Sequence, residues 1–123
     1  MTPWVRYFGN VVLVQNLGMS GSPSAVVYNG KLYVFHQGID NNGQLWYSAF
    51  DGASWSTDQQ IQPLGMSASP SAVLWAGGIT VFHQGYGNNG QLWYTYSPDG
   101  THWGEDTLVQ NVGMTDAPSA LVF

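Results

Sequence analysis

The sequence contains no cysteine, and only two of its 123 residues, Arg6 and Lys31, carry a basic side chain. Without cysteine the fold depends on no disulfide, and the redox compartment stays open. Nucleic-acid binding draws on a basic stripe that displaces phosphate counterions, and anionic membranes attract similar clusters. Two basic residues against seven acidic ones, a net charge of −5, provide neither. We therefore expect no nucleic-acid partner and no membrane insertion.

Long apolar runs are also missing, and so is a signal-type segment near the N-terminus. We expect the chain to be soluble, and secretion stays open because a leader could have been removed. Charged residues make up 7% of the chain, whereas about a quarter is usual. The surface must therefore rely on Asn, Gln, Ser, Thr and Gly, which suit the uncharged hydrogen bonds of a sugar and equally suit β turns.

An internal repeat is the main feature that the sequence does contain. The stretch Val34–Tyr47, VFHQGIDNNGQLWY, returns as Val81–Tyr94, VFHQGYGNNGQLWY. Gly18-Met19-Ser20 returns at Gly65 and again, with Thr in third place, at Gly113, so the spacings are 47 and 48 residues. A period of this length that is filled with strands is typical of propeller blades or of another β array.

The first full repeat predicts four strands that form an antiparallel meander. Val34–Tyr47 has the form of a hairpin, with two aromatic and β-branched runs around a Gly/Asn turn. Asn29-Gly30 is a type I′ turn pair that predicts another hairpin. The expected strands are Ser24–Asn29, Lys31–Gln37, Gln44–Phe50 and Gln59–Gln62. The second repeat keeps this scheme with one residue added before Trp103, at a turn where an insertion is tolerated.

The central strands are apolar on both faces. Alternation points Leu32, Val34 and His36 to one side and Tyr33, Phe35 and Gln37 to the other. An antiparallel sheet with one wet face would alternate apolar and polar residues, so this sheet must be covered on both sides. Neighbouring blades of a propeller or the stacked sheets of a sandwich would cover it. The period of 47 residues favours an all-β propeller of four-stranded antiparallel blades.

The repeat divides the chain into one propeller segment with incomplete ends. Residues 1–17 hold the end of a blade with a strand at Val11–Leu17, 18–64 and 65–112 are full blades, and 113–123 hold a first strand at Ala117–Phe123. A propeller needs roughly four to eight blades, which this chain alone does not supply. We therefore expect a homo-oligomer, a dimer or a trimer, closed by head-to-tail contacts. A fragment of a longer repeat array is the alternative.

The blade pattern resembles that of the PLL-type bacterial and PVL-type fungal propeller lectins. The resemblance lies in Gly30–Phe35 (GKLYVF), Gly43–Tyr47 (GQLWY), Phe50–Gly52 (FDG) and Trp55. It covers roughly Gly18–Val112 and implies a ring of blades that binds monosaccharides, often fucose-like, in pockets between adjacent blades. His36-Gln37 and its copy depart from the pattern, since the lectins carry other polar residues there.

The pairs His36-Gln37 and His83-Gln84 are candidate sugar ligands. Each pair ends a strand beside an Asn-Asn-Gly turn and a Trp, where it could bond sugar hydroxyls. The alternative is a structural bond to the backbone of a neighbouring blade. Because the two members of a pair point to opposite faces, at most one of them lines a given pocket.

Four tryptophans are candidates for stacking on a pyranose ring. Trp46 and Trp93 lie within the third strand of each repeat, where packing between blades is the alternative. Trp55 and Trp103 follow the Asp-Gly turn, and the sequence leaves stacking and packing equally open for them. Aromatic rings in these positions suit both roles, since they bring a large apolar area and one polar nitrogen.

Asn42 and Asn89 complete the candidate ligand-binding residues, and turn chemistry alone also explains them. The string Asp40-Asn41-Asn42-Gly43 resembles part of a calcium loop, but the second copy has Gly87 in place of Asp40 and an EF-hand's spacing is missing. The histidines show no metal-ligand spacing. We expect neither a metal nor a cofactor.

An enzyme is not expected from this inventory. The turn Ser97–Trp103 resembles the Asp-box of sialidase-type propellers, but a sialidase needs a cluster of arginines and Arg6 is the only one. The acids Asp51/Asp99 and Asp58/Asp106 recur as repeat pairs, as structural turn acids would. No nucleophile motif accompanies the histidines, and no carboxylate pair is singled out for glycoside hydrolysis.

The sequence therefore predicts a carbohydrate-binding lectin, an oligomeric β-propeller whose partners are glycans and further copies of the chain. Several identical weak sites on one ring would bind with avidity. The alternative is a structural or engineered propeller fragment that assembles without a ligand.

Overall fold

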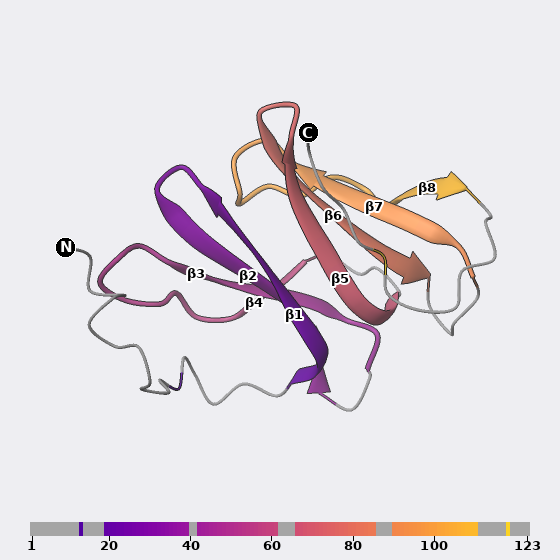
Figure 1. The fold of residues 1–123 in the computed structure, drawn as a ribbon, viewed down its shortest axis with the longest axis horizontal. Helices are drawn as coiled ribbons and strands as arrows, with labels where there is room; N and C mark the ends of the chain where they lie inside the picture. Colours follow the sequence, from indigo (N-terminus) through magenta and orange to yellow (C-terminus); the bar gives the residue numbers. More distant parts are fainter. Residues whose placement is uncertain are drawn as a thin grey trace.

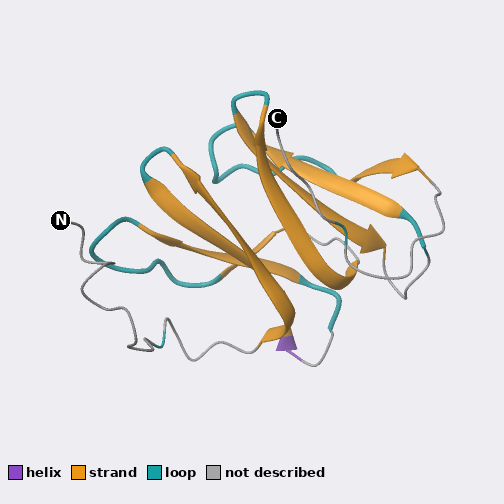
Figure 2. Ribbon diagram, in the orientation of Figure 1, coloured by secondary structure: helices purple, strands orange, loops and turns teal. Residues whose placement is uncertain are grey.

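The computed structural model describes residues 13, 19–39, 42–61, 66–85, 90–110 and 118. This part of the chain is all-β and forms two four-stranded antiparallel sheets (Figures 1 and 2). The strands predicted at Val11–Leu17 and Ala117–Phe123, like residue Asn89, fall outside the described residues, apart from the single positions Leu13 and Pro118.

Sheet 1 contains β1 to β4 in the order β1-β2-β3-β4, so the predicted meander is confirmed. Asn29 and Gly30, with φ of 51° and 73°, join the first two strands as the predicted left-handed turn. The four strands are β1 (Met19–Tyr28), β2 (Lys31–Gly38), β3 (Leu45–Phe50) and β4 (Gln59–Ile61).

Strand β1 begins five residues before the predicted start at Ser24. The sequence prediction took Pro23 as the strand entry, because proline cannot donate to a ladder. The strand instead passes through a register shift between Ser20 and Ser24, and Gly21 within it has φ 69°. A bulge of this kind tolerates proline.

Sheet 2 repeats sheet 1 with the order β5-β6-β7-β8. Strand β5 begins at Met66, 47 residues after β1, and β8 begins at Thr107, 48 residues after β4. The extra residue lies in the turn between β7 and β8, as predicted. The four strands are β5 (Met66–Trp75), β6 (Gly78–Gly85), β7 (Leu92–Ser97) and β8 (Thr107–Gln110).

Each sheet has two faces of different composition. Residues paired directly across neighbouring strands share a face, and Phe35 pairs with Tyr47 while His36 pairs with Trp46. The predicted alternation along β2 is therefore confirmed. We call one face aromatic, with Tyr33, Phe35 and Tyr47 in sheet 1 and Thr80, Phe82 and Tyr94 in sheet 2. We call the other face aliphatic, with Leu32 and Val34 in sheet 1 and Ile79 and Val81 in sheet 2.

The core lies where the aromatic face of sheet 1 packs on the aliphatic face of sheet 2. Phe35, Ile79 and Val81 are all fully buried there. Trp103, from the turn between β7 and β8, meets the Phe35 ring edge-on with centroids 5.6 Å apart and lies 5.8 Å from the Tyr47 ring. The two sheets therefore stack in the same sense, front to back.

Hydrogen bonds join the first strands of the two sheets, which run side by side in Figure 1. The backbone nitrogen of Ser22 donates to Ser69 Oγ over 2.7 Å, and that of Ala72 donates to Ser24 Oγ over 2.9 Å. Serine hydroxyls can satisfy backbone groups of a neighbouring strand without a continuous ladder. The stack is therefore held by polar contacts along β1 and β5 and by apolar packing behind them.

Candidate functional site

Two buried histidines lie against carboxylates at equivalent places in the sheets. His36 Nε2 lies 2.9 and 3.0 Å from the two oxygens of Asp58, and His83 Nε2 lies 2.8 Å from Asp106 Oδ1. The histidine side chains are 3% and 0% exposed and the carboxylates 15% and 17%. The sequence prediction treated these acids as structural turn residues and missed that they are the partners of the histidines.

The hydrogen-bond pattern of these pairs fixes part of their proton arrangement. His36 Nδ1 lies 3.0 Å from the carbonyl oxygen of Gln37, and His83 Nδ1 lies 3.0 Å from that of Gln84. A carbonyl oxygen only accepts, so Nδ1 carries a hydrogen in both rings. The other ring nitrogen, Nε2, lies within hydrogen-bond distance of the carboxylate. Every ring nitrogen therefore has a partner within the chain, which favours the structural interpretation of the histidines.

A serine beside the first pair does not complete a catalytic triad. Ser48 Oγ donates to Asp58 Oδ1 over 3.0 Å, on the same carboxylate that holds His36. In a serine nucleophile triad the histidine stands between the hydroxyl and the acid, where it removes the hydroxyl proton. Here the acid stands between, so His36 does not activate Ser48.

Gln37 lies on the opposite face from His36, as predicted, and joins the two sheets. Its side chain is buried at 1% exposure. The Gln37 amide is assigned the orientation in which both its nitrogen and its oxygen have a hydrogen-bond partner. The nitrogen then donates to the Ala68 carbonyl over 3.2 Å, and the oxygen accepts from the Gly43 backbone nitrogen over 3.2 Å. Gln84, at the equivalent place in sheet 2, is also buried. A bond from Gln37 to the neighbouring sheet is the structural alternative considered for this residue.

Asn42 organises the turn before β3. Its Oδ1 accepts from the Gln44 backbone nitrogen over 2.9 Å, and its Nδ2 donates to Gln44 Oε1 over 3.2 Å. Trp46 Nε1 donates to the same Gln44 oxygen over 3.1 Å, and Trp93 Nε1 bonds Gln91 in the same way. Both tryptophans are half-buried. Their indole nitrogens are therefore used within the turn, which leaves only the rings to contact a ligand.

Trp55 and Trp103 occupy different environments although they are repeat equivalents. The Trp55 ring stacks on Phe50 of its own sheet, with centroids 5.0 Å apart. Trp103 packs across the junction onto Phe35 and Tyr47. Its Nε1 is buried and has no hydrogen-bond partner among the described residues. A buried indole nitrogen normally finds an acceptor, so this one is an exception among the described side chains.

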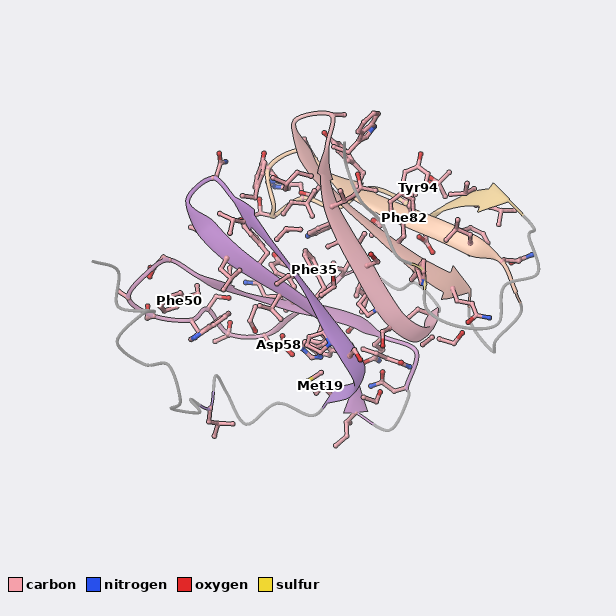
Figure 3. All side chains as sticks on the ribbon, viewed as in Figure 1. Met19, Phe35, Phe50, Asp58, Phe82 and Tyr94 are labelled. Carbon is pink, nitrogen blue, oxygen red and sulfur yellow. The ribbon has the colours of Figure 1, made fainter. Side chains whose placement is uncertain are left out.

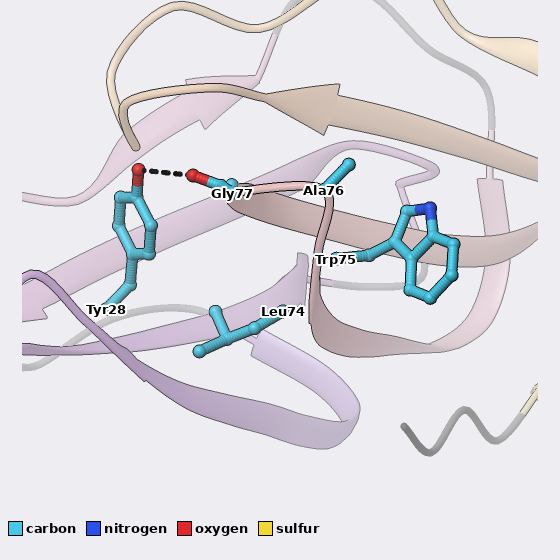
Figure 4. Close-up of a pocket in the computed structure, with 6 residues that line it drawn as sticks. Tyr28, Leu74, Trp75, Ala76 and Gly77 are labelled. Carbon is cyan, nitrogen blue, oxygen red and sulfur yellow. Dashed lines mark hydrogen bonds between the residues drawn. The ribbon is translucent and has the colours of Figure 1, made fainter. Parts of the chain in front are cut away.

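A hollow of about 290 Å³ opens between the sheets at the tip of the β5–β6 hairpin (Figure 4). Tyr28 bounds it from sheet 1, and its hydroxyl donates to the carbonyl oxygens of Gly77 over 2.9 Å and Pro98 over 2.6 Å. Trp75 and Leu74 remain 63% and 41% exposed. The hollow is lined by Tyr28, Leu74, Trp75, Ala76, Gly77 and Gly78.

The sequence prediction did not include these residues among the ligand candidates. The available signal was the replacement of Tyr28 by Trp75 at the same repeat position, beside an exposed turn. Large aromatics kept at a solvent-facing turn are more informative than aromatics within a strand, since a strand aromatic is explained by packing. None of the residues predicted as sugar ligands lines this hollow.

The Asp-Gly turns after β3 and β7 are held by their own carboxylates. Asp99 Oδ1 accepts from the backbone nitrogens of His102 (2.8 Å) and Thr101 (2.9 Å), and these bonds keep the pKa of the Asp99 carboxyl far below its ordinary value. Bonds from Ser54 and Ala53 lower the pKa of Asp51 in the same way. Both acids stabilise turns, as their recurrence in the repeat predicted.

Among the described residues, no group of three or more His, Cys, Asp and Glu side chains is placed to hold a metal ion. Within the same residues there is no helix with the length and hydropathy to cross a membrane. Comparison of the chain with models of known protein families and with curated proteins returned no match.

Proposed function

We propose that the protein is a carbohydrate-binding lectin, in which the two sheets are blades of a β-propeller and a monosaccharide site lies between them. The observation that carries the proposal is the hollow at the junction, where the Tyr28 ring, the Leu74 side chain and the backbone carbonyl of Gly77 come together. Aromatic and apolar surface with a few fixed polar groups is the usual lining of a small-ligand site. A volume of about 290 Å³ suits a single sugar ring rather than a large ligand.

The chemistry of the hollow fits a neutral sugar. Tyr28 offers its ring to the C–H groups of a pyranose, and the Gly77 carbonyl beside its hydroxyl can accept a hydrogen bond from a sugar hydroxyl. No lysine or arginine lies among the lining residues, so an anionic ligand has no counter-charge there.

The alternative is a propeller segment that assembles without a ligand. The observation that favours it is the use of His36, Gln37 and His83 in bonds within the chain. These side chains join strands and sheets, so the repeat motif serves packing. The two functions differ in a measurable way, because only a lectin responds to sugar.

Isothermal titration with fucose, galactose and N-acetylglucosamine tests the proposal. We expect heat of binding from at least one sugar, and we expect Tyr28→Ala to weaken that binding by about tenfold or more, since the aromatic contact in the hollow is lost. Ile39→Ala is the control, because Ile39 is an exposed apolar residue, at 56%, that does not line the hollow. Silence across all three sugars, or an equal loss in both variants, would contradict the proposal.

A further inference from the structure

The two outward surfaces of the stack correspond, by repeat position, to the two surfaces that pack together between the sheets. Within the chain, the aromatic face of sheet 1 packs on the aliphatic face of sheet 2. The aromatic face of sheet 2 and the aliphatic face of sheet 1 are left on the outside. Figure 3 shows Phe35 between the sheets, whereas Phe82 and Tyr94 lie on sheet 2.

Exposure separates the equivalent residues of the two aromatic faces. Phe35 and Tyr47 are 0% and 4% exposed, whereas Phe82 and Tyr94, at the same repeat positions, are only half-buried. The rings of Phe82 and Tyr94 contact each other with centroids 6.1 Å apart, as Phe35 and Tyr47 do at 5.8 Å. The surface of sheet 2 is therefore arranged like the covered surface of sheet 1, but no third sheet among the described residues packs on it.

The aliphatic faces also differ in exposure, but here the face of sheet 2 is the buried one and the face of sheet 1 the exposed one. Val81 is fully buried and Met66 is 1% exposed in sheet 2. Their equivalents in sheet 1 are more exposed: Val34 is half-buried and Met19 is 41% exposed. An apolar surface that is buried in one repeat and exposed in the next lacks its neighbour.

The tryptophans after the Asp-Gly turns fit the same scheme. Trp103 reaches from sheet 2 onto the Phe35 and Tyr47 rings of sheet 1. Its equivalent, Trp55, belongs to the outward aliphatic side of sheet 1 and stacks on Phe50. In a repeated stack Trp55 would reach the Phe82 and Tyr94 rings of the preceding unit.

We propose that the aromatic face of sheet 2 binds the aliphatic face of sheet 1 on a second copy of this chain, in the register that joins the two sheets within the chain. The contact places Trp55 of one copy on Phe82 and Tyr94 of the other. Because the two surfaces differ, the contact is head-to-tail, and its repetition leads to a ring or an open stack. The proposal shares with the proposed function only the premise that the sheets stack as blades.

Two single-face variants test the interface. Phe82→Glu places a charge on the aromatic face of sheet 2, and Val34→Glu places one on the aliphatic face of sheet 1. An unpaired buried charge is costly, so each variant should raise the dissociation constant at least about 100-fold. By light scattering we expect the wild-type protein to exceed the monomer mass and each variant alone to be a monomer. Ala53→Glu, in an exposed turn, is the control that keeps the wild-type mass.

Mixing the two variants distinguishes the proposed contact from any symmetric one. Each variant keeps one intact face, so an equimolar mixture should form a species of two chains and nothing larger. A face that binds its own kind would instead let one variant associate by itself. A monomeric wild-type protein, or a mixture that stays monomeric although circular dichroism shows both variants folded, would overturn the proposal.

Milder variants cover the case in which a charge prevents folding. Tyr94→Ala and Trp55→Ala remove one ring from each side and should weaken association about tenfold each, with an unchanged mass for Ile39→Ala. All masses are measured without sugar. A chain that assembles but binds no sugar overturns the proposed function alone, and a monomer that binds sugar overturns the interface alone.

Discussion

The buried histidines show how single residues hold each sheet. His36 and His83 connect the second strand of their sheets to acids 22 and 23 residues later, before the fourth strand. The environments of the two acids differ at the neighbouring hydroxyl. Ser48 donates a second bond to Asp58, whereas Thr95, its counterpart, bonds the Gly104 carbonyl instead. Asp106 therefore depends more on its histidine than Asp58 does.

His83→Leu should lower the free energy of unfolding by about 1–2 kcal/mol, since a partly buried carboxylate loses its donor. His36→Leu should cost less, because Ser48 still donates to Asp58. Chemical denaturation of both variants measures the difference. A double-mutant cycle of His83→Leu with Asp106→Asn should give a coupling of about 0.5–3 kcal/mol. Equal losses in the two histidine variants would show that the serine bond contributes nothing.

For single residues, the sequence predicted the face of the strand on which a side chain lies, but not the residue that it contacts. Alternation placed His36 and Gln37 on opposite faces correctly, because the side-chain period of a strand is fixed. The pairing of His36 with Asp58 could not be predicted, since it depends on the path of the segment between β3 and β4. The hollow beside Tyr28 was missed for the same reason, because its other walls come from residues 46 or more positions later.

Among the elements, the turns between the third and fourth strands of the two sheets differ in how closely they are packed. Gly100, with φ 84°, lies where a Cβ atom would stand 2.8 Å from the Tyr33 ring carbon Cζ. Gly52, with φ 102°, has nothing within 4 Å of the same position. The turn of sheet 2 therefore receives the Tyr33 ring of sheet 1, whereas the turn of sheet 1 is open.

Gly100→Ala should destabilise the protein more than Gly52→Ala. Both changes force a left-handed backbone onto alanine, at about 1–2 kcal/mol, and only the first also crowds the Tyr33 ring, for about 1–3 kcal/mol more. Thermal unfolding of the pair isolates the crowding, since the backbone cost is common to both. Adding Tyr33→Ala to Gly100→Ala should reduce its extra cost, and a difference unaffected by Tyr33 would contradict this explanation.

Element types and their order could be predicted from the sequence, and some of their ends could not. The turn pairs and the hairpin motif predicted β2, β3 and β4 within one residue, because tight turns fix where strands stop. The start of β1 was wrong by five residues, because the bulge that accommodates Pro23 requires contact with the neighbouring strand. Ser69 supplies that contact to the Ser22 backbone.

For the whole molecule, the front-to-back stack makes identical motif residues unequal. Phe35 and Phe82 occupy the same place in the same motif, yet Phe35 lies between two sheets and Phe82 on an outer face. The sequence could predict that both faces of each sheet need cover. The sequence could not show which of the two equivalent faces is covered within one chain.

Phe35→Ala should cost about 3–5 kcal/mol of unfolding free energy in dilute protein, since it empties a site in contact with Trp103. Phe82→Ala should cost about 1–2 kcal/mol under the same conditions, because its ring is already partly exposed. Urea titration at low protein concentration measures both. Similar losses would mean that something other than a second sheet covers Phe35.

The front-to-back direction in which the sheets stack also determines how such a chain can lengthen. A sheet added to either end takes up one outward surface and presents another of the same kind, so the number of unsatisfied surfaces never changes. Tandem duplication of the repeat therefore requires no newly adapted contact. Under the proposed head-to-tail contact, growth would end where the angle between successive sheets brings the last surface back to the first.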